Sequence, residues 1–118
     1  MEIQSIRGKP ASILGLAEPG SLESGCVDLA WQAGINYFFF YGMSSDSPWL
    51  RDLRSLLKQQ RESVIVATGS EQREIPQWHA YLEQVRQTLD IETVDILFAE
   101  YVSPTDNWQQ VQGLLNQL

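Results

Sequence analysis

The chain is poor in the features that mark metal, secreted, membrane and nucleic-acid-binding proteins: it has one cysteine, few basic residues and no long apolar run. Cys26 cannot form a disulfide within the chain, and no residues around it have the spacing of metal ligands. The net charge is −7 with scattered Lys and Arg, which disfavours nucleic acid and anionic membrane surfaces as partners. No apolar run approaches the roughly 20 residues of a membrane-spanning helix, and the N-terminus lacks a signal-peptide pattern. These absences predict a cytoplasmic, soluble protein without a metal site.

What the sequence does contain is one domain, residues 1–118, in which short apolar strands alternate with amphipathic helices. In its central stretch a helix ends at Gly34, in the left-handed position that follows many helices. The apolar and aromatic run Ile35–Tyr41 comes next and is typical of a strand buried on both faces. Similar patterns predict strands over residues 12–17, 35–41, 63–68 and 94–101, and helices over residues 22–33, 48–60, 77–89 and 108–118.

Residues at the ends of these segments refine the prediction. Ser21, Ser47 and Asp106 are expected N-caps, and Pro48 follows Ser47 at the first helical position, where a missing N–H is tolerated. The first ten residues are expected to form a short strand or a hairpin arm closed at Gly8. The buried face of the first helix is predicted to contain the following apolar residues: Leu22, Cys26, Leu29, Ala30 and Ala33.

Four strand–helix units in succession indicate an α/β fold with a parallel sheet and crossover helices. Two architectures have this order of elements: an open doubly wound sheet and one half of an eight-stranded barrel. Periodicity does not separate them, because the strands are short and apolar in both.

Short patterns spread over residues 12–118 carry a family resemblance, because they occur in the order and spacing of one known family. They are Ile13-Leu-Gly-Leu-Ala17, Leu29-Ala-Trp-Gln-Ala-Gly-Ile-Asn-Tyr-Phe38, Arg61-Glu-Ser-Val-Ile-Val-Ala-Thr68, and Tyr81-Leu-Glu-Gln-Val-Arg-Gln-Thr-Leu89 with Val94-Asp-Ile-Leu97. These patterns resemble the N-terminal half of the aldo-keto reductases. The resemblance implies four βα units that form half of a (β/α)8 TIM barrel.

The resemblance also implies a chemistry to test against this sequence. Aldo-keto reductases reduce carbonyls with NADPH and use an Asp, a Tyr, a Lys and a His at the C-terminal ends of the strands. The Tyr protonates the carbonyl oxygen, the Lys–Asp pair lowers the pKa of the Tyr, and the His orients the substrate.

Most of these four positions are replaced in this chain. The Asp position is Phe39 and the Lys position is Gly69, so the pair that tunes the tyrosine is missing. The Tyr position is Ser44 in a gap-free match, or Tyr41 if the loop is shorter, and the His position is Glu100. Tyr41 and Glu100 are therefore the catalytic candidates.

Each candidate also has an ordinary structural interpretation. Tyr41 is either a surviving acid or an amphipathic residue with its ring packed and its hydroxyl in water. Glu100 either has a raised pKa and binds or catalyses, or is hydrogen-bonded to a neighbouring loop. His79 is expected at the surface, Asp95 is expected to hydrogen-bond a helix terminus, and Cys26 is expected in the core.

The sequence thus predicts a degenerate, truncated aldo-keto reductase-like protein without oxidoreductase activity, which acts as a binding or assembly module and needs no cofactor. The alternative is an NADP-dependent aldo-keto reductase that is active only with a missing C-terminal half or a partner chain, and NADPH is then its cofactor.

Half a barrel leaves two sheet edges and an apolar face uncovered. The sheet is then expected to flatten, to pair with a second copy as a homodimer, or to bind another protein. Tryptophans that stay exposed are natural anchors for such a contact, whereas the others belong to the core. The four candidates are Trp31, Trp49, Trp78 and Trp108.

Overall fold

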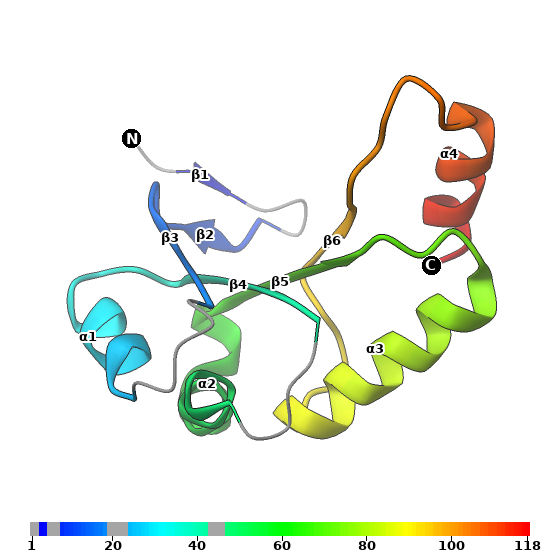
Figure 1. The fold of residues 1–118 in the computed structure, drawn as a ribbon. Helices are drawn as coiled ribbons and strands as arrows, with labels where there is room; N and C mark the ends of the chain where they lie inside the picture. Colours follow the sequence, from blue (N-terminus) through cyan, green and yellow to red (C-terminus); the bar gives the residue numbers. More distant parts are fainter. Residues whose placement is uncertain (1–2, 5–7, 19–23, 43–46) are drawn as a thin grey trace.

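The computed structural model describes residues 3–4, 8–18, 24–42 and 47–118 of the chain (Figure 1). The strands are β1 (Ile3–Gln4), β2 (Pro10–Ala11), β3 (Gly15–Ala17), β4 (Tyr37–Tyr41), β5 (Ile65–Ser70) and β6 (Ile96–Ala99). The helices are α1 (Cys26–Gln32), α2 (Pro48–Gln60), α3 (Ile75–Leu89) and α4 (Trp108–Gln117), and a 3-10 turn spans Arg61–Ser63.

Strands β3 to β6 form a parallel sheet in the order β3-β4-β5-β6, so each strand pairs with the next one along the chain. A doubly wound sheet requires a reversal in strand order, and the described strands contain none. Figure 1 shows α1, α2 and α3 on one side of this sheet and the antiparallel β1–β2 hairpin on the other. The predicted α/β fold with a four-stranded parallel sheet is confirmed.

The core lies between the sheet and helices α1 to α3. Phe38 and Phe40 point from β4 toward α2, where Trp49 meets both rings edge-on at centroid distances of 6.2 and 6.3 Å. Leu53 of α2 and Val66 of β5 are also fully buried in this cluster. Each such side chain contributes about 1.5–3 kcal/mol by leaving water, so this single layer holds most of the stabilising apolar area.

The other face of the sheet is only partly covered, so the prediction that Ile35–Tyr41 is buried on both faces is wrong. Tyr37 and Phe39 are half-buried, and Tyr41 is 58% exposed. The physical reason is that all three core helices pack on one side. The β1–β2 hairpin reaches the opposite face beside Ile65 and Ile96, near the N-terminal ends of their strands.

Helix α2 follows its sequence signals closely. It begins at Pro48 and ends at Gln60 as predicted, and the Ser47 hydroxyl accepts a hydrogen bond from the Leu50 N–H at 3.3 Å. Gly34 has a φ of 92°, which confirms the left-handed position after α1.

Helix α1 starts later than predicted, at Cys26, after Gly25 with a φ of 92°. Ser21 and Leu22 lie outside the described residues. The buried residues of α1 are Val27 and Ala30, whereas Leu29 is 68% exposed, so the predicted buried face is wrong there. Two positions along a helix correspond to about 200° of rotation, so burial of Val27 turns Leu29 to solvent.

Helix α4 is capped by Asn107 rather than by the predicted Asp106. The Asn107 side chain accepts hydrogen bonds from the N–H groups of Gln109 and Gln110, whereas the Asp106 carboxylate accepts from the Ser103 N–H at 2.7 Å. Val111 and Leu114 of α4 are buried, and Trp108 is 60% exposed. Of the four tryptophans, Trp49 and Trp78 are therefore core residues, Trp31 is half-buried and Trp108 is exposed.

Asp95 has a structural role, but it binds a strand rather than the predicted helix terminus. Its carboxylate accepts hydrogen bonds from the Val66 N–H at 2.8 Å, Lys9 Nζ at 3.0 Å and Arg61 Nη1 at 3.0 Å. Burial opposes ionisation, yet the Val66 N–H and the two cations together hold the pKa of Asp95 below its ordinary value. This cluster ties the segment before β2 to the N-terminal side of the sheet.

Within the described residues, no helix is both long and apolar enough to cross a bilayer.

Candidate functional site

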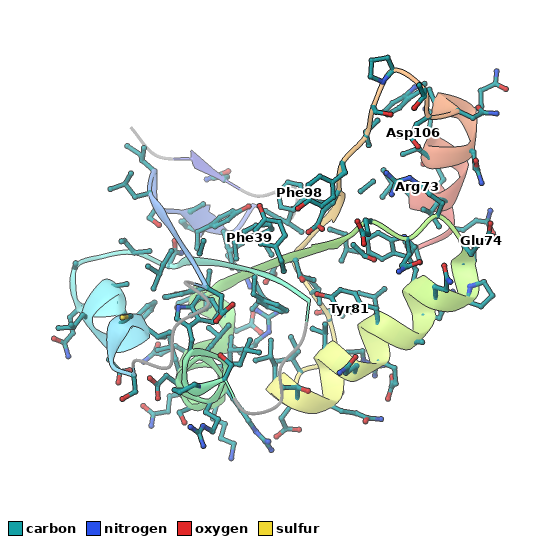
Figure 2. The ribbon with its side chains drawn as sticks, in the orientation of Figure 1. Phe39, Arg73, Glu74, Tyr81, Phe98 and Asp106 are labelled. Carbon is teal, nitrogen blue, oxygen red and sulfur yellow. The ribbon has the colours of Figure 1, made fainter. Side chains whose placement is uncertain are left out.

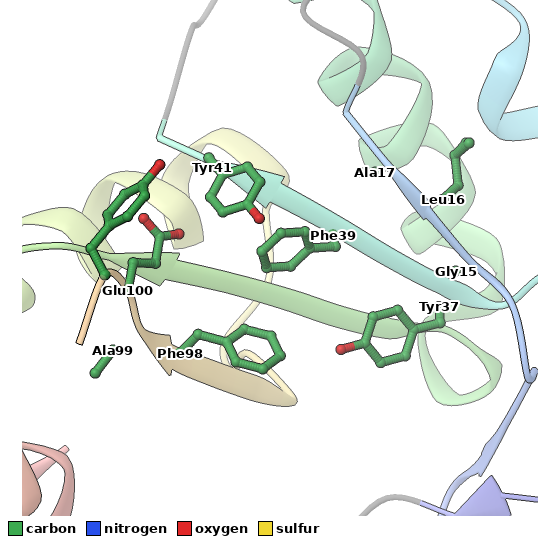
Figure 3. Close-up of a pocket in the computed structure, with 10 residues that line it drawn as sticks. Gly15, Leu16, Ala17, Tyr37, Phe39, Tyr41, Phe98, Ala99 and Glu100 are labelled. Atoms are coloured by element: carbon green, nitrogen blue, oxygen red, sulfur yellow. The ribbon is translucent and has the colours of Figure 1, made fainter. Parts of the chain in front are cut away.

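The residues singled out by the sequence meet at the C-terminal ends of β4, β5 and β6 (Figure 3). Tyr41 pairs in register with Gly69, and Gly69 pairs with Phe98. Because side chains alternate along a strand, Phe39, Tyr41 and Gly69 share the face that lies opposite α1 to α3. Glu100 follows β6 directly and reaches the same end of the sheet.

Four aromatic side chains on this face, Tyr37, Phe39, Tyr41 and Phe98, form what we term the open-face cluster. The ring of Phe39 packs edge-on against Tyr41 at 4.4 Å and against Phe98 at 5.3 Å. The cluster lines a shallow, largely apolar cavity of about 560 Å³. Of the described residues that line this cavity, Glu100 alone carries a carboxylate.

Glu100 lies directly over Gly69. A Cβ atom placed on Gly69 would stand 2.7 Å from Oε1 of Glu100, 2.8 Å from the Phe98 carbonyl oxygen and 2.9 Å from Cγ of Glu100. Real Cβ atoms do not approach other heavy atoms this closely. The glutamate side chain therefore fills the space into which any side chain at position 69 would extend.

The Glu100 carboxyl is in an unfavourable place for a charge. Burial, and then the nearby charge of Glu71, raise its pKa above the ordinary value. Its Oε1 is buried and accepts no hydrogen bond from any residue that the structure describes. The expected hydrogen bond from a loop reaches the Glu100 backbone instead, because Arg73 Nη2 donates to its carbonyl oxygen at 2.6 Å.

Arg73 links the loops that follow β5 and β6, and the sequence prediction missed it. Its Nη1 donates to the Glu71 carbonyl at 2.8 Å and to the Gln72 carbonyl at 3.2 Å. Its Nε lies 3.6 Å from the Asp106 carboxylate, so the guanidinium points toward α4 (Figure 2). An arginine in a polar loop carries no sequence signal for this role, since its partners are backbone carbonyls brought together by the fold.

Tyr81 is a second residue whose position in the site was missed. Its hydroxyl lies 2.6 Å from Thr68 Oγ1, and Thr68 Oγ1 donates to the Phe40 carbonyl at 2.8 Å. Because the Thr68 proton is used in that bond, Tyr81 donates to Thr68, and its own oxygen accepts from the Gly42 N–H. Burial, together with the charge of Glu100, raises the pKa of Tyr81. The phenol is thus fixed in orientation and protonated.

The remaining predicted residues take no part in this arrangement. His79 is exposed on α3, and Cys26 is half-buried against the core with a free thiol. Ser44, the gap-free match to the family tyrosine, lies outside the described residues. Among the described residues no three His, Cys, Asp or Glu side chains are grouped as metal ligands.

Comparison with known proteins adds no assignment. No known family model matches the chain, and no curated protein is significantly similar to it in sequence. The functional argument therefore rests on the geometry of the site.

Proposed function

We propose that the chain is a half barrel of the aldo-keto reductase type that has lost the family's chemistry and acts as an assembly module. The sequential parallel order β3-β4-β5-β6 and the position of helices α1 to α3 on one side of the sheet support the half-barrel interpretation. Of the residues aligned with the family's catalytic positions, Tyr41, Gly69 and Glu100 lie at the end of the sheet where a barrel enzyme carries its site. Phe39 lies on the same face as Tyr41, two residues earlier in β4.

Loss of reductase activity follows from the chemistry of these positions. Phe39 offers no charge in place of the Asp, and Gly69 offers no side chain in place of the Lys. Glu100 occupies the space above Gly69, so even a lysine introduced there would meet the carboxyl and the Phe98 carbonyl. Tyr41 thus has no Asp–Lys pair beside it to promote proton transfer.

The observation that carries the proposed assembly function is the open-face cluster. Tyr37, Phe39, Tyr41 and Phe98 gather on a face without a covering helix layer, and Phe98 remains 40% exposed. Aromatic side chains dominate the energetics of protein interfaces because they bury a large area with few rotatable bonds.

A second copy of the chain is the proposed occupant of this face. The chain carries a net charge of −7, but in the part of the chain that the structure describes, Glu100 is the only carboxylate at the cavity on the open face. Two copies related by a two-fold axis would therefore join neutral aromatic surfaces and keep most of their anionic groups apart. Each copy would cover the apolar face that the other leaves open.

The test is the mass of the protein in solution, measured by light scattering during size-exclusion chromatography. The wild type is expected to be a dimer, and Phe98→Glu is expected to be a monomer because it places a charge within the cluster. Leu29→Glu, which adds the same charge at an exposed site on α1, is the matched control and should remain a dimer. A monomeric wild type overturns pairing with a second copy.

Titration with NADPH separates the assembly module from the alternative reductase. We expect no saturable binding tighter than roughly millimolar, an affinity worth about 4 kcal/mol. Micromolar binding would overturn the loss of reductase chemistry, and aldehyde reduction by Tyr41 and Glu100 variants would then be measured.

The proposed location is the cytoplasm, where a lone free thiol such as that of Cys26 stays reduced.

A further inference from the structure

A second cavity, of about 660 Å³, lies where β4, β5 and β6 end beside α3. It adjoins the cavity on the open face and shares Tyr41, Glu100 and Tyr101 with it. This is the end of a parallel sheet at which α/β proteins commonly bind ligands. The residues of α3 form its outer wall. The lining residues are Tyr41, Gly42, Gly69, Ser70, Glu71, Gln72, Gln77, Ala80, Tyr81, Gln84, Glu100 and Tyr101.

The charged side chains that line the cavity are acidic. Among the described residues, the lining includes two carboxylates, Glu71 and Glu100, and no Lys, Arg or His. The guanidinium of Arg73 is nearby but is directed to backbone carbonyls and to Asp106. Arg73 thus bridges the backbone carbonyls of Glu71 and Glu100, whereas its ion-pair partner is the Asp106 carboxylate rather than either of these two carboxylates.

The two carboxylates also interact unfavourably with each other. The charge of Glu71 contributes to the raised pKa of Glu100, and Oε1 of Glu100 accepts no hydrogen bond within the described part of the chain. A bound cation would offset this repulsion and favour the ionised form of Glu100, since an opposite charge within about 4–6 Å stabilises a carboxylate.

The uncharged part of the lining suits an organic cation better than a metal ion. Three phenol rings, those of Tyr41, Tyr81 and Tyr101, line the cavity, and aromatic rings attract ammonium groups through their π-electrons. Metal ions need a compact set of ligand atoms, and the described residues offer no group of three His, Cys, Asp or Glu side chains. We propose that this cavity binds a small organic cation that carries a primary ammonium group, held between Glu100, Glu71 and the tyrosine rings.

The ammonium group has two possible sources, a free amine or the side chain of a lysine in another protein. Both are tested by following the backbone amide signals of the full chain by NMR during titration. The ligands are 1,4-diaminobutane, the blocked amino acid Nα-acetyl-lysine methylamide, and 1,4-butanediol, which has a similar shape to the diamine without charge. Tighter binding of the diamine identifies a free amine, and tighter binding of the blocked lysine identifies a protein side chain.

The variants test the role of each carboxylate. Glu100→Gln keeps the shape of the side chain and is expected to weaken binding by about tenfold or more, because it removes a charge-assisted hydrogen bond. Glu71→Gln, at an exposed position, is expected to weaken binding by roughly threefold. Glu92→Gln removes the same charge from the loop before β6, at the opposite end of the sheet, and should leave the affinity unchanged.

Saturable shifts of the Gly42, Gly69 and Ser70 signals with either amine, lost in the Glu100 and Glu71 variants, support the proposal. Equal binding of 1,4-butanediol overturns it, because charge is then irrelevant. Equal weakening by Glu92→Gln also overturns it, because the effect is then one of net charge alone. The NADPH and oligomer measurements have readouts of their own, namely cofactor binding and the mass in solution, so failure of this proposal leaves the assembly proposal standing.

Discussion

Substitution of Gly69 by alanine tests the close contact between β5 and Glu100. The added Cβ would stand 2.7 and 2.9 Å from two atoms of the Glu100 side chain and 2.8 Å from the Phe98 carbonyl oxygen. The glutamate can rotate away, but the carbonyl belongs to the neighbouring strand β6 and moves only with the backbone. Overpacking of this kind costs about 1–3 kcal/mol, so Gly69→Ala is expected to lower the free energy of unfolding by that amount.

The assay is urea denaturation followed by far-UV circular dichroism, with Gly113→Ala as the matched control. Gly113 lies inside α4, and a Cβ placed there meets no atom within 4 Å. Alanine is the better helix former by about 1 kcal/mol, so the same substitution is expected to stabilise the protein at position 113 and to destabilise it at position 69.

A double-mutant cycle divides the cost between the two neighbours of Gly69. In a Glu100→Ala background, two of the three close contacts are absent, so Gly69→Ala should cost less there than in the wild type. The contact with the Phe98 carbonyl persists, so the cost should not vanish. A neutral or stabilising Gly69→Ala in the wild-type background would refute the close approach of Glu100 to β5.

Three further predictions concern stability and its dependence on pH. Ser47→Ala removes the side-chain cap of α2 and is expected to cost about 1 kcal/mol in urea denaturation; an unchanged midpoint would contradict the cap. The lowered pKa of Asp95 means that its contribution is present above the pKa of the unfolded state and is lost as the pH falls through the folded value. Asp95→Asn should therefore cost about 3 kcal/mol near neutral pH and show a smaller loss of stability in acid than the wild type; parallel acid profiles would contradict this. The pKa of Glu100 is raised rather than lowered, so the free energy of unfolding falls as the pH rises through the folded-state pKa of this group. Glu100→Gln should make that decrease smaller; an unchanged pH profile would contradict the burial of this carboxyl.

Local signals in the sequence accounted for much of the secondary structure. The Ser47–Pro48 pair set the start of α2, and Gly34 set the end of α1, because each acts through its own backbone geometry. The alternation of short apolar strands with helices indicated the parallel sheet. The first helix was less predictable, because its short span and the turn at Gly25 left Val27 rather than Leu29 facing the sheet.

The site was only partly predictable for a related reason. Tyr41 and Glu100 were identified because they match the tyrosine and histidine positions of the family that the sequence resembles, and both stand where an apolar strand was expected to end. Arg73 and Tyr81 were missed because their partners, the Glu100 carbonyl and Thr68, are 27 and 13 residues away. Nothing in the local pattern around either residue encodes such a distant partner.

The sequence by itself determined the order of strands and helices, the anionic character of the chain and the absence of an internal disulfide, since these depend on residue type and near neighbours. Only the tertiary structure decided which face of the sheet stays uncovered, because that depends on all core helices packing on one side. It also decided that the Glu100 side chain lies over Gly69 and near Glu71. That contact joins strands β5 and β6 through space, and its geometry is fixed by the register between them.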